Sequence, residues 1–159
     1  MVFLLEHPEA SLVRKTFVLR QMDIPPSIAM TKRSLLRWFA LSFGLISERE
    51  SRATVLNVLD ALFYFLLTQK TSPTTLDLQA FLLGKHQQKV SEKLIRYHLN
   101  RLIEVELLVR KNRKYFFNNN PYTEPNSLKD SFSHWIKQPV NNSLNEIERV
   151  LEKLCESYK

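Results

Sequence analysis

The sequence contains very little glycine and almost no cysteine. Glycine accounts for 2 of 159 residues, which excludes glycine-rich nucleotide loops and disfavours a β-barrel with many tight turns. Cys155 is the single cysteine, so intramolecular disulfides and cysteine-based metal clusters are excluded as well. A single cysteine suits a reducing cytoplasm. Together these absences favour a mainly helical protein.

Long apolar runs are also missing. The most apolar stretch, Val55–Leu67, is interrupted by Asn57 and Asp60 and is shorter than the roughly 20 residues of a membrane span. The first apolar run, Val2–Leu5, is too short for a secretion signal and lacks a basic region before it. We therefore expect a cytoplasmic protein without a membrane partner.

Motifs of common enzyme families are absent. The sequence has no Gly-x-x-x-x-Gly-Lys loop, no Gly-x-Gly-x-x-Gly, no His-Glu-x-x-His and no Gly-x-Ser-x-Gly. The histidines lack the spacing of metal ligands; they are His7, His86, His98 and His134. We expect no catalytic residues, no metal and no cofactor.

Positive charge is in excess and is concentrated in one segment. The chain carries a formal net charge of +7 and has a pI of about 9.6. Between Lys85 and Lys114, nine Lys and Arg residues outnumber three acidic ones, which gives +6. A basic run is often only a solvated face, but a focused excess favours a polyanionic partner such as nucleic acid.

The N-terminal residues predict two strands followed by a helix. The apolar run Val2–Glu6 and the alternating positions in Val13–Leu19 indicate two strands, with His7–Ser11 as the turn. A helix from Thr31 or Lys32 to Ile46 follows, with Gly44 as a weak point inside it. Its apolar residues at helical spacing are Leu35, Leu36, Phe39, Phe43 and Ile46.

Two further helices are predicted in the middle of the chain. Ser47 and Glu50 have capping-box spacing and indicate a helix that runs to about Thr68. A short helix over Thr75–Leu83 follows, with Gly84 as its C-cap. The apolar face of the longer helix contains Val55, Leu59, Leu62, Phe63 and Leu66.

The most informative pattern lies between Val90 and Phe117. Ser91 is a good N-cap for a helix over Glu92–Val105. Leu107–Phe117 indicates two short strands around a turn at Asn112 and Arg113. The apolar residues expected to face inwards from the helix are Leu94, Ile95, Leu99, Leu102 and Ile103.

This order of elements resembles the winged helix-turn-helix DNA-binding fold. The resemblance rests on the capping serine, a His-Leu-x-x-Leu run at His98–Leu102, an apolar pair and a basic hairpin ending in aromatic residues. It covers about 70 of 159 residues, from Glu48 to Asn118. Glu106 departs from the family, which usually has glycine there. Either Glu106 adopts a left-handed conformation at some cost, or the helix runs slightly longer.

The expected fold is mainly α with a small β-hairpin wing. Residues 47–120 form the winged helix-turn-helix domain, between an N-terminal flank over 1–46 and a C-terminal helical flank over 121–159. The resemblance implies a recognition helix over about 91–105 in the major groove and a wing over about 107–117 on phosphates or in the minor groove.

Polar and basic side chains on the outer face of this helix and on the wing are the candidate DNA contacts. Lys93, Arg96 and Asn100 are expected at base edges. Tyr97 is a candidate phosphate contact and fits a half-buried surface aromatic equally well. The full set is Lys89, Ser91, Lys93, Arg96, Tyr97, Asn100, Arg101, Arg110, Lys111, Arg113 and Lys114.

The C-terminal flank predicts a dimerisation helix. A short helix over Leu128–Lys137 is followed by a linker at Pro139–Asn142, and Ser143 with Glu146 forms a second capping box. The last helix carries a heptad stripe. Its members are Leu144, Ile147, Leu151, Leu154 and Tyr158. The alternative is that this stripe packs on Phe132, Trp135 or the helix starting at Lys32 within one subunit.

The function predicted from these features is sequence-specific binding of double-stranded DNA by a homodimeric, nucleoid-associated transcriptional regulator. Two alternatives stay open. One is a winged-helix subunit that binds other proteins in a chromosome-maintenance or transcription assembly. The other is a plasmid or viral replication or partition factor, which shares the DNA chemistry and differs in its target site.

Overall fold

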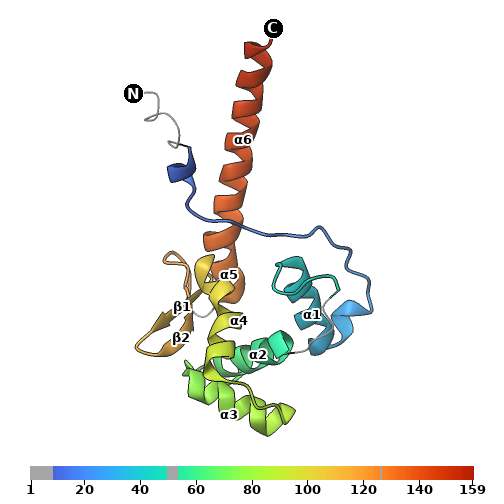
Figure 1. The fold of residues 1–159 in the computed structure, drawn as a ribbon, viewed down its shortest axis with the longest axis vertical. Helices are drawn as coiled ribbons and strands as arrows, with labels where there is room; N and C mark the ends of the chain where they lie inside the picture. The colour runs from blue at the N-terminus through green and yellow to red at the C-terminus, as the bar shows by residue number, and fades with distance from the viewer. Residues whose placement is uncertain (1–8, 50–53, 126) are drawn as a thin grey trace.

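The computed structural model of the chain describes residues 9–49, 54–125 and 127–159 (Figure 1). The protein is mainly helical, with one small antiparallel hairpin. The helices are α1 (Lys32–Ser42), α2 (Thr54–Phe63), α3 (Thr75–His86), α4 (Glu92–Glu104), α5 (Leu128–Phe132) and α6 (Gln138–Ser157). Short helical turns are η2 (Ala10–Leu12), η3 (Ile28–Met30), η4 (Tyr64–Thr68) and η5 (Ser133–Lys137), and the strands are β1 (Leu108–Lys111) and β2 (Lys114–Phe117).

One hydrophobic core joins distant parts of the chain. Helix α2 is apolar on nearly all sides and contacts α1, α3 and α4. Buried residues from the two ends of the chain enter the same core, among them Leu36 and Phe43 near α1 and Ile136 in η5. Helix α6 instead extends away from this body (Figure 1). Within the described ranges, no helix is long and apolar enough to cross a membrane.

The strand predicted at Val13–Leu19 is wrong. Residues 13–24 are extended but pair with no strand among the described residues, and Val2–Glu6, the other predicted strand, lies outside them. The segment is held by Arg20, whose Nη1 donates to the carbonyl oxygens of Leu41 and Ile46, each at 2.7 Å. Apolar alternation alone does not make a strand when no partner strand supplies the hydrogen bonds.

Helix α1 begins as predicted but ends earlier. Thr31 caps it by accepting a hydrogen bond from the Ser34 amide. The helix stops at Ser42 because Gly44 adopts φ +71°, a left-handed conformation that favours glycine. Gly44 is therefore the helix stop rather than a weak point inside a longer helix. Leu35 is half exposed and does not belong to the core, contrary to the prediction.

The predicted bounds of the two central helices also change. Residues 47–49 are not helical, so Ser47 does not open α2, and its predicted partner Glu50 lies outside the described residues. The helix does continue to Thr68, through the π-helical turn η4. Gly84 is not the C-cap of α3, which runs on to His86 and is closed by Gln87 at φ 48°. Thr74 and Asp77 form the capping box at its start.

The linker predicted at Pro139–Asn142 is helical instead. Helix α6 follows directly from the π-helical turn η5, and Pro139 lies at this junction, in the first turn of α6. Ser143 is consequently inside the helix and does not cap it, so the second capping box is wrong. The helix predicted over Leu128–Lys137 is confirmed as α5 followed by η5.

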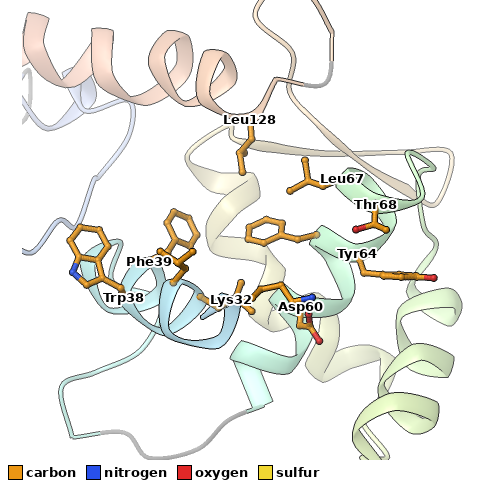
Figure 2. A pocket seen from close by; sticks show the side chains of 11 residues that line it. Lys32, Trp38, Phe39, Asp60, Tyr64, Leu67, Thr68 and Leu128 are labelled. Atoms are coloured by element: carbon orange, nitrogen blue, oxygen red, sulfur yellow. Dashed lines mark ion pairs between the residues drawn. The ribbon is translucent and has the colours of Figure 1, made fainter. Parts of the chain in front are cut away.

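An open apolar groove lies between α1 and α2, with a volume of about 450 Å³ (Figure 2). Its lining includes Trp38 and Phe39 from α1, Tyr64 and Leu67 from η4, and Leu128 at the start of α5. The exposed side chains of Leu35 and Leu67 are explained by this groove, because both border it.

Candidate nucleic-acid interface

Helix α4 presents a polar, partly basic face to solvent. Ser91 caps the helix by accepting a hydrogen bond from the Leu94 amide at 3.1 Å, as predicted. The inward face is formed by buried Ile95, Leu99 and Leu102, whereas Leu94 is 40% exposed and not inward, contrary to the prediction. Ile103 is half-buried. The opposite face carries the exposed candidates Lys93, Arg96, Tyr97 and Asn100, with Arg101 half-buried at its edge and exposed Lys89 just before the helix.

The two halves of this face differ in what surrounds them. Asn100 donates a hydrogen bond to Glu104 Oε1 at 2.8 Å. Asn100, Arg101 and Glu104 also line a hollow of about 260 Å³ whose other wall includes Gly44 and Leu45. Neither Lys93 nor Arg96 borders this hollow, so the N-terminal half of the helix is the more open one. This bond uses one Nδ2 hydrogen of Asn100 and leaves the second N–H and the Oδ1 available for a base.

The wing has the predicted hairpin geometry. Arg110 pairs with Tyr115 and Lys111 with Lys114 across the two strands. The turn residues Asn112 and Arg113 have φ values of 53° and 66°, as a two-residue hairpin turn of the primed type requires. Glu106, between α4 and the wing, has φ 67°, which confirms the left-handed conformation expected where glycine is missing.

The wing is attached to the start of α3. The Tyr115 amide donates to the Pro73 carbonyl at 2.9 Å, and Thr74 and Lys114 form an isolated β-bridge. The Tyr115 side chain is fully buried, with its hydroxyl 3.4 Å from Thr75 Oγ1. The hairpin is therefore held on two sides, by α4 through the chain and by α3 through Tyr115.

The cations of the wing form no ion pair with acidic side chains in the described part of the chain. Glu106 pairs with Lys15 at 3.0 Å, so one of the acids in the basic segment is engaged by the N-terminal segment. Arg110, Lys111, Arg113 and Lys114 are exposed, and no acidic side chain in residues 9–49, 54–125 or 127–159 forms an ion pair with them. Arg110 lies over the Tyr115 ring, 5.7 Å from its centroid. The wing thus carries positive charge at a fixed position.

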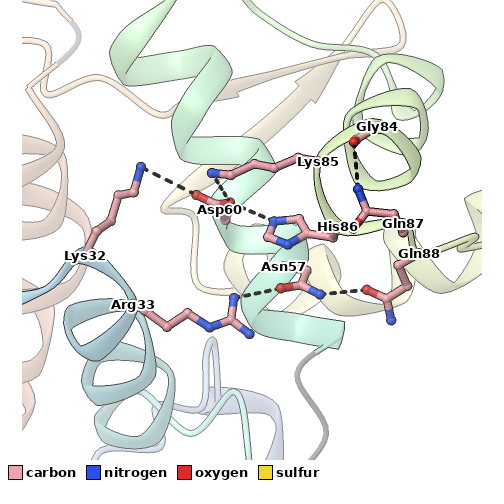
Figure 3. A network of polar contacts seen from close by, with 9 residues as sticks. All are labelled: Lys32, Arg33, Asn57, Asp60, Gly84, Lys85, His86, Gln87 and Gln88. Atoms are coloured by element: carbon pink, nitrogen blue, oxygen red, sulfur yellow. Dashed lines mark hydrogen bonds and ion pairs between the residues drawn. The ribbon is translucent and has the colours of Figure 1, made fainter.

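A partly buried polar network fixes the link between α3 and α4 (Figure 3). Arg33 Nη1 donates to Asn57 Oδ1 at 2.7 Å, and Asn57 Nδ2 donates to Gln88 Oε1 at 2.8 Å. Gln88 Nε2 in turn donates to Thr54 Oγ1 at 2.9 Å. Reasoning from the sequence missed this network; the available signal was a polar residue, Asn57, inside a strongly apolar helix.

Asp60 is the second buried polar residue of that helix. Its Oδ2 lies 2.8 Å from both Lys85 Nζ and His86 Nε2, at the end of α3. Burial alone would raise the pKa of this carboxyl, but the hydrogen bonds from Lys85 and His86 and the charges of Lys85 and Lys32 outweigh it, so the pKa of Asp60 lies below its ordinary value.

The lowered pKa predicts that Asp60 stabilises the fold at neutral pH and that this stabilisation is lost in acid. Because the carboxyl has a lower pKa folded than unfolded, it stabilises the fold above its unfolded pKa of about 3.9, and this stabilisation is lost as the pH falls through the folded pKa. We expect wild type to exceed Asp60→Asn in unfolding free energy at neutral pH, and the difference to shrink below about pH 4. Urea unfolding across this range measures it. A difference independent of pH would contradict the assignment.

The heptad stripe of α6 is exposed. Leu144, Ile147, Leu151, Leu154 and Tyr158 are 46–88% exposed, and Val150 beside them is exposed too. Packing of this stripe on Phe132, Trp135 or α1 within one subunit is therefore wrong, since the described part of the chain covers none of these residues.

Among the described residues, no group of three or more His, Cys, Asp or Glu could hold a metal ion.

Comparison with protein-family models, with curated proteins and with solved structures finds no match for this chain.

Proposed function

We propose that the protein binds double-stranded DNA as a winged helix-turn-helix transcriptional regulator. Helices α2, α3 and α4 form the helical part, the link at residues 87–91 is the turn, and β1–β2 is the wing. The observation that carries the proposal is the exposed positive charge of the wing, which no acidic side chain among the described residues pairs with, next to the polar outer face of α4. Such a surface suits phosphates flanking a groove.

Each part of the surface has a different role in this proposal. Lys93 and Arg96, on the open half of α4, contact base edges in the major groove, where arginine pairs with guanine. Asn100 contributes to base recognition through its second N–H and its Oδ1, while its bond to Glu104 orients the amide. The cations of the wing hold phosphates or enter the minor groove, and so set the orientation of the domain.

A homodimer is part of the same proposal. A single recognition helix reads few base pairs, and two copies related by symmetry read two half-sites. The exposed stripe on α6 offers the surface for pairing, as Leu and Ile at heptad spacing do in coiled coils. Because an isolated helix pair of about two heptads is weak, other contacts must contribute.

The first test measures binding of a random duplex of about 30 base pairs by fluorescence anisotropy at two salt concentrations. Micromolar binding that weakens steeply with salt supports the proposal. Absence of binding at low salt would refute it and would favour the alternative, a winged-helix subunit that binds other proteins.

The wing variant Arg113→Ala/Lys114→Ala is expected to weaken binding of all sequences alike. Loss of two phosphate contacts lowers the salt slope by about 2 and the affinity by about 10- to 100-fold at moderate salt. The control, Lys153→Ala/Lys159→Ala, removes the same charge from the end of α6 and from the residues that follow it, and leaves the slope unchanged. If the wing variant keeps the wild-type affinity and slope, the wing does not bind DNA.

A further inference from the structure

The apolar groove between α1 and α2 has one polar end. Figure 2 shows Lys32 and Asp60 at that end and Leu67 and Leu128 at the other. The volume of about 450 Å³ lies within the range of small-molecule sites, which are mostly apolar with a few polar groups. The walls are aromatic and aliphatic, so the body of a bound molecule must be apolar.

Positive charge is in surplus at the polar end. Asp60 is already satisfied by Lys85 and His86, which both contact its Oδ2 at 2.8 Å. Lys32 approaches only Oδ1, at 4.0 Å, and its side chain is 75% exposed (Figure 3). The Asp60 carboxylate thus faces the ammonium groups of both Lys85 and Lys32, and its contact with Lys32 is the longer of the two. A second carboxylate at this place would find a cation ready to pair with it.

The position of Lys32 in its helix points the same way. Lys32 is the first residue of α1, Arg33 follows it, and the first turn contains no acidic residue. Cations are unfavourable at a helix N-terminus because the helix dipole is positive there, whereas an anion is favourable. A bound anion at this end of the groove would compensate both the dipole and Lys32.

We propose that this groove binds a small monocarboxylate with an apolar body, such as a medium-chain fatty acid or an arylalkyl acid. The carboxylate pairs with Lys32, and the body lies along Trp38, Phe39 and Leu67 towards Leu128. The proposal does not depend on DNA binding, because the groove lies between α1 and α2 rather than on the outer face of α4 or on the wing.

The test uses decanoate, with decanol as the uncharged match, and follows the indole N–H signals in ¹⁵N-NMR spectra of the full chain. The chain has two tryptophans, so Trp38 in the groove reports binding and Trp135 serves as an internal control. We expect decanoate to shift the Trp38 signal saturably and to bind about tenfold more tightly than decanol, the difference expected of one charge-assisted contact.

Three variants define the site. Lys32→Gln, at an exposed position, should bring decanoate down to the affinity of decanol. Leu67→Asp should abolish the Trp38 shift with both ligands, whereas Leu83→Asp, at an exposed leucine of α3 outside the groove, should leave it unchanged. Equal affinity for both ligands, insensitivity to Lys32→Gln or absence of a Trp38 shift would overturn the proposal. The proposal would also be overturned if the Leu151→Glu variant bound decanoate and wild type did not. In that case the groove of wild type would be occupied by α6 of a second copy.

Discussion

Tyr115→Ala is expected to lower the free energy of unfolding by about 3–5 kcal/mol, the usual cost of truncating a fully buried aromatic side chain. Tyr115 is 0% exposed and is among the largest fully buried side chains of the core. Its removal leaves a cavity between β2 and α3. The buried Thr75 hydroxyl also loses its contact with the Tyr115 hydroxyl. Thermal unfolding should occur roughly 10–15 °C lower than in wild type for a chain of this size.

Two further variants, Tyr115→Phe and Phe116→Ala, separate the loss of core packing at Tyr115 from the loss of its hydroxyl and from truncation elsewhere on β2. Tyr115→Phe removes only the hydroxyl, whose contact with Thr75 is long at 3.4 Å, and should cost no more than about 1 kcal/mol. Phe116→Ala truncates the next residue, which points outwards and is 38% exposed, and should also cost about 1 kcal/mol or less. Differential scanning calorimetry measures all three. Equal losses for Tyr115→Ala and Phe116→Ala would show that Tyr115 does not anchor the wing.

The elements predicted best from the sequence are those encoded by neighbouring residues. Ser91 lies at the start of α4 and caps it through a residue three positions away. The turn at Asn112 and Arg113 joins strands of four residues each, so its geometry depends on a short stretch of chain. Local signals of this kind need no knowledge of the rest of the fold.

The two glycines show why other bounds were wrong. Gly44 ends α1 in a left-handed conformation, and a Cβ at this position would lie 2.8 Å from Val18 Cγ1. Gly84 stays inside α3 with open space around it. Gly44 and Gly84 differ in this contact with Val18, which lies far earlier in the chain. No local sequence pattern around either glycine indicates such a contact. Gly44→Ala is accordingly more disruptive in this structure than Gly84→Ala.

The exposed cations of the candidate site could be predicted from the sequence. The contacts between helices that hold the site in place could not. Charge counting along the chain identifies the wing because it needs no knowledge of packing. The environment of Asp60 depends on Lys85, 25 residues further on, and on Lys32, which comes from another helix. Both partners approach only when α1, α2 and α3 have packed together, so the groove and its polar end emerge from the tertiary structure.

Leu151→Glu is expected to separate a dimer into monomers. Leu151 is central in the exposed stripe of α6, between Ile147 and Leu154. A glutamate here would bring a charge into an apolar seam with no partner to neutralise it. Sedimentation equilibrium should give twice the chain mass of 18.8 kDa for wild type and the single chain mass for the variant. Asn145→Glu adds the same charge away from the stripe and should remain dimeric.

The same variant is expected to have a large effect on DNA binding. A duplex with two half-sites is bound by both recognition helices of a dimer, and losing the second attachment lowers affinity by about 100-fold or more. A duplex with one half-site should be bound almost equally by Leu151→Glu and by wild type, because α4 and the wing are unchanged. Anisotropy titrations with both duplexes distinguish the two effects. If wild type is monomeric at micromolar concentration both alone and on DNA, α6 does not pair with itself, and the dimer part of the proposal is wrong.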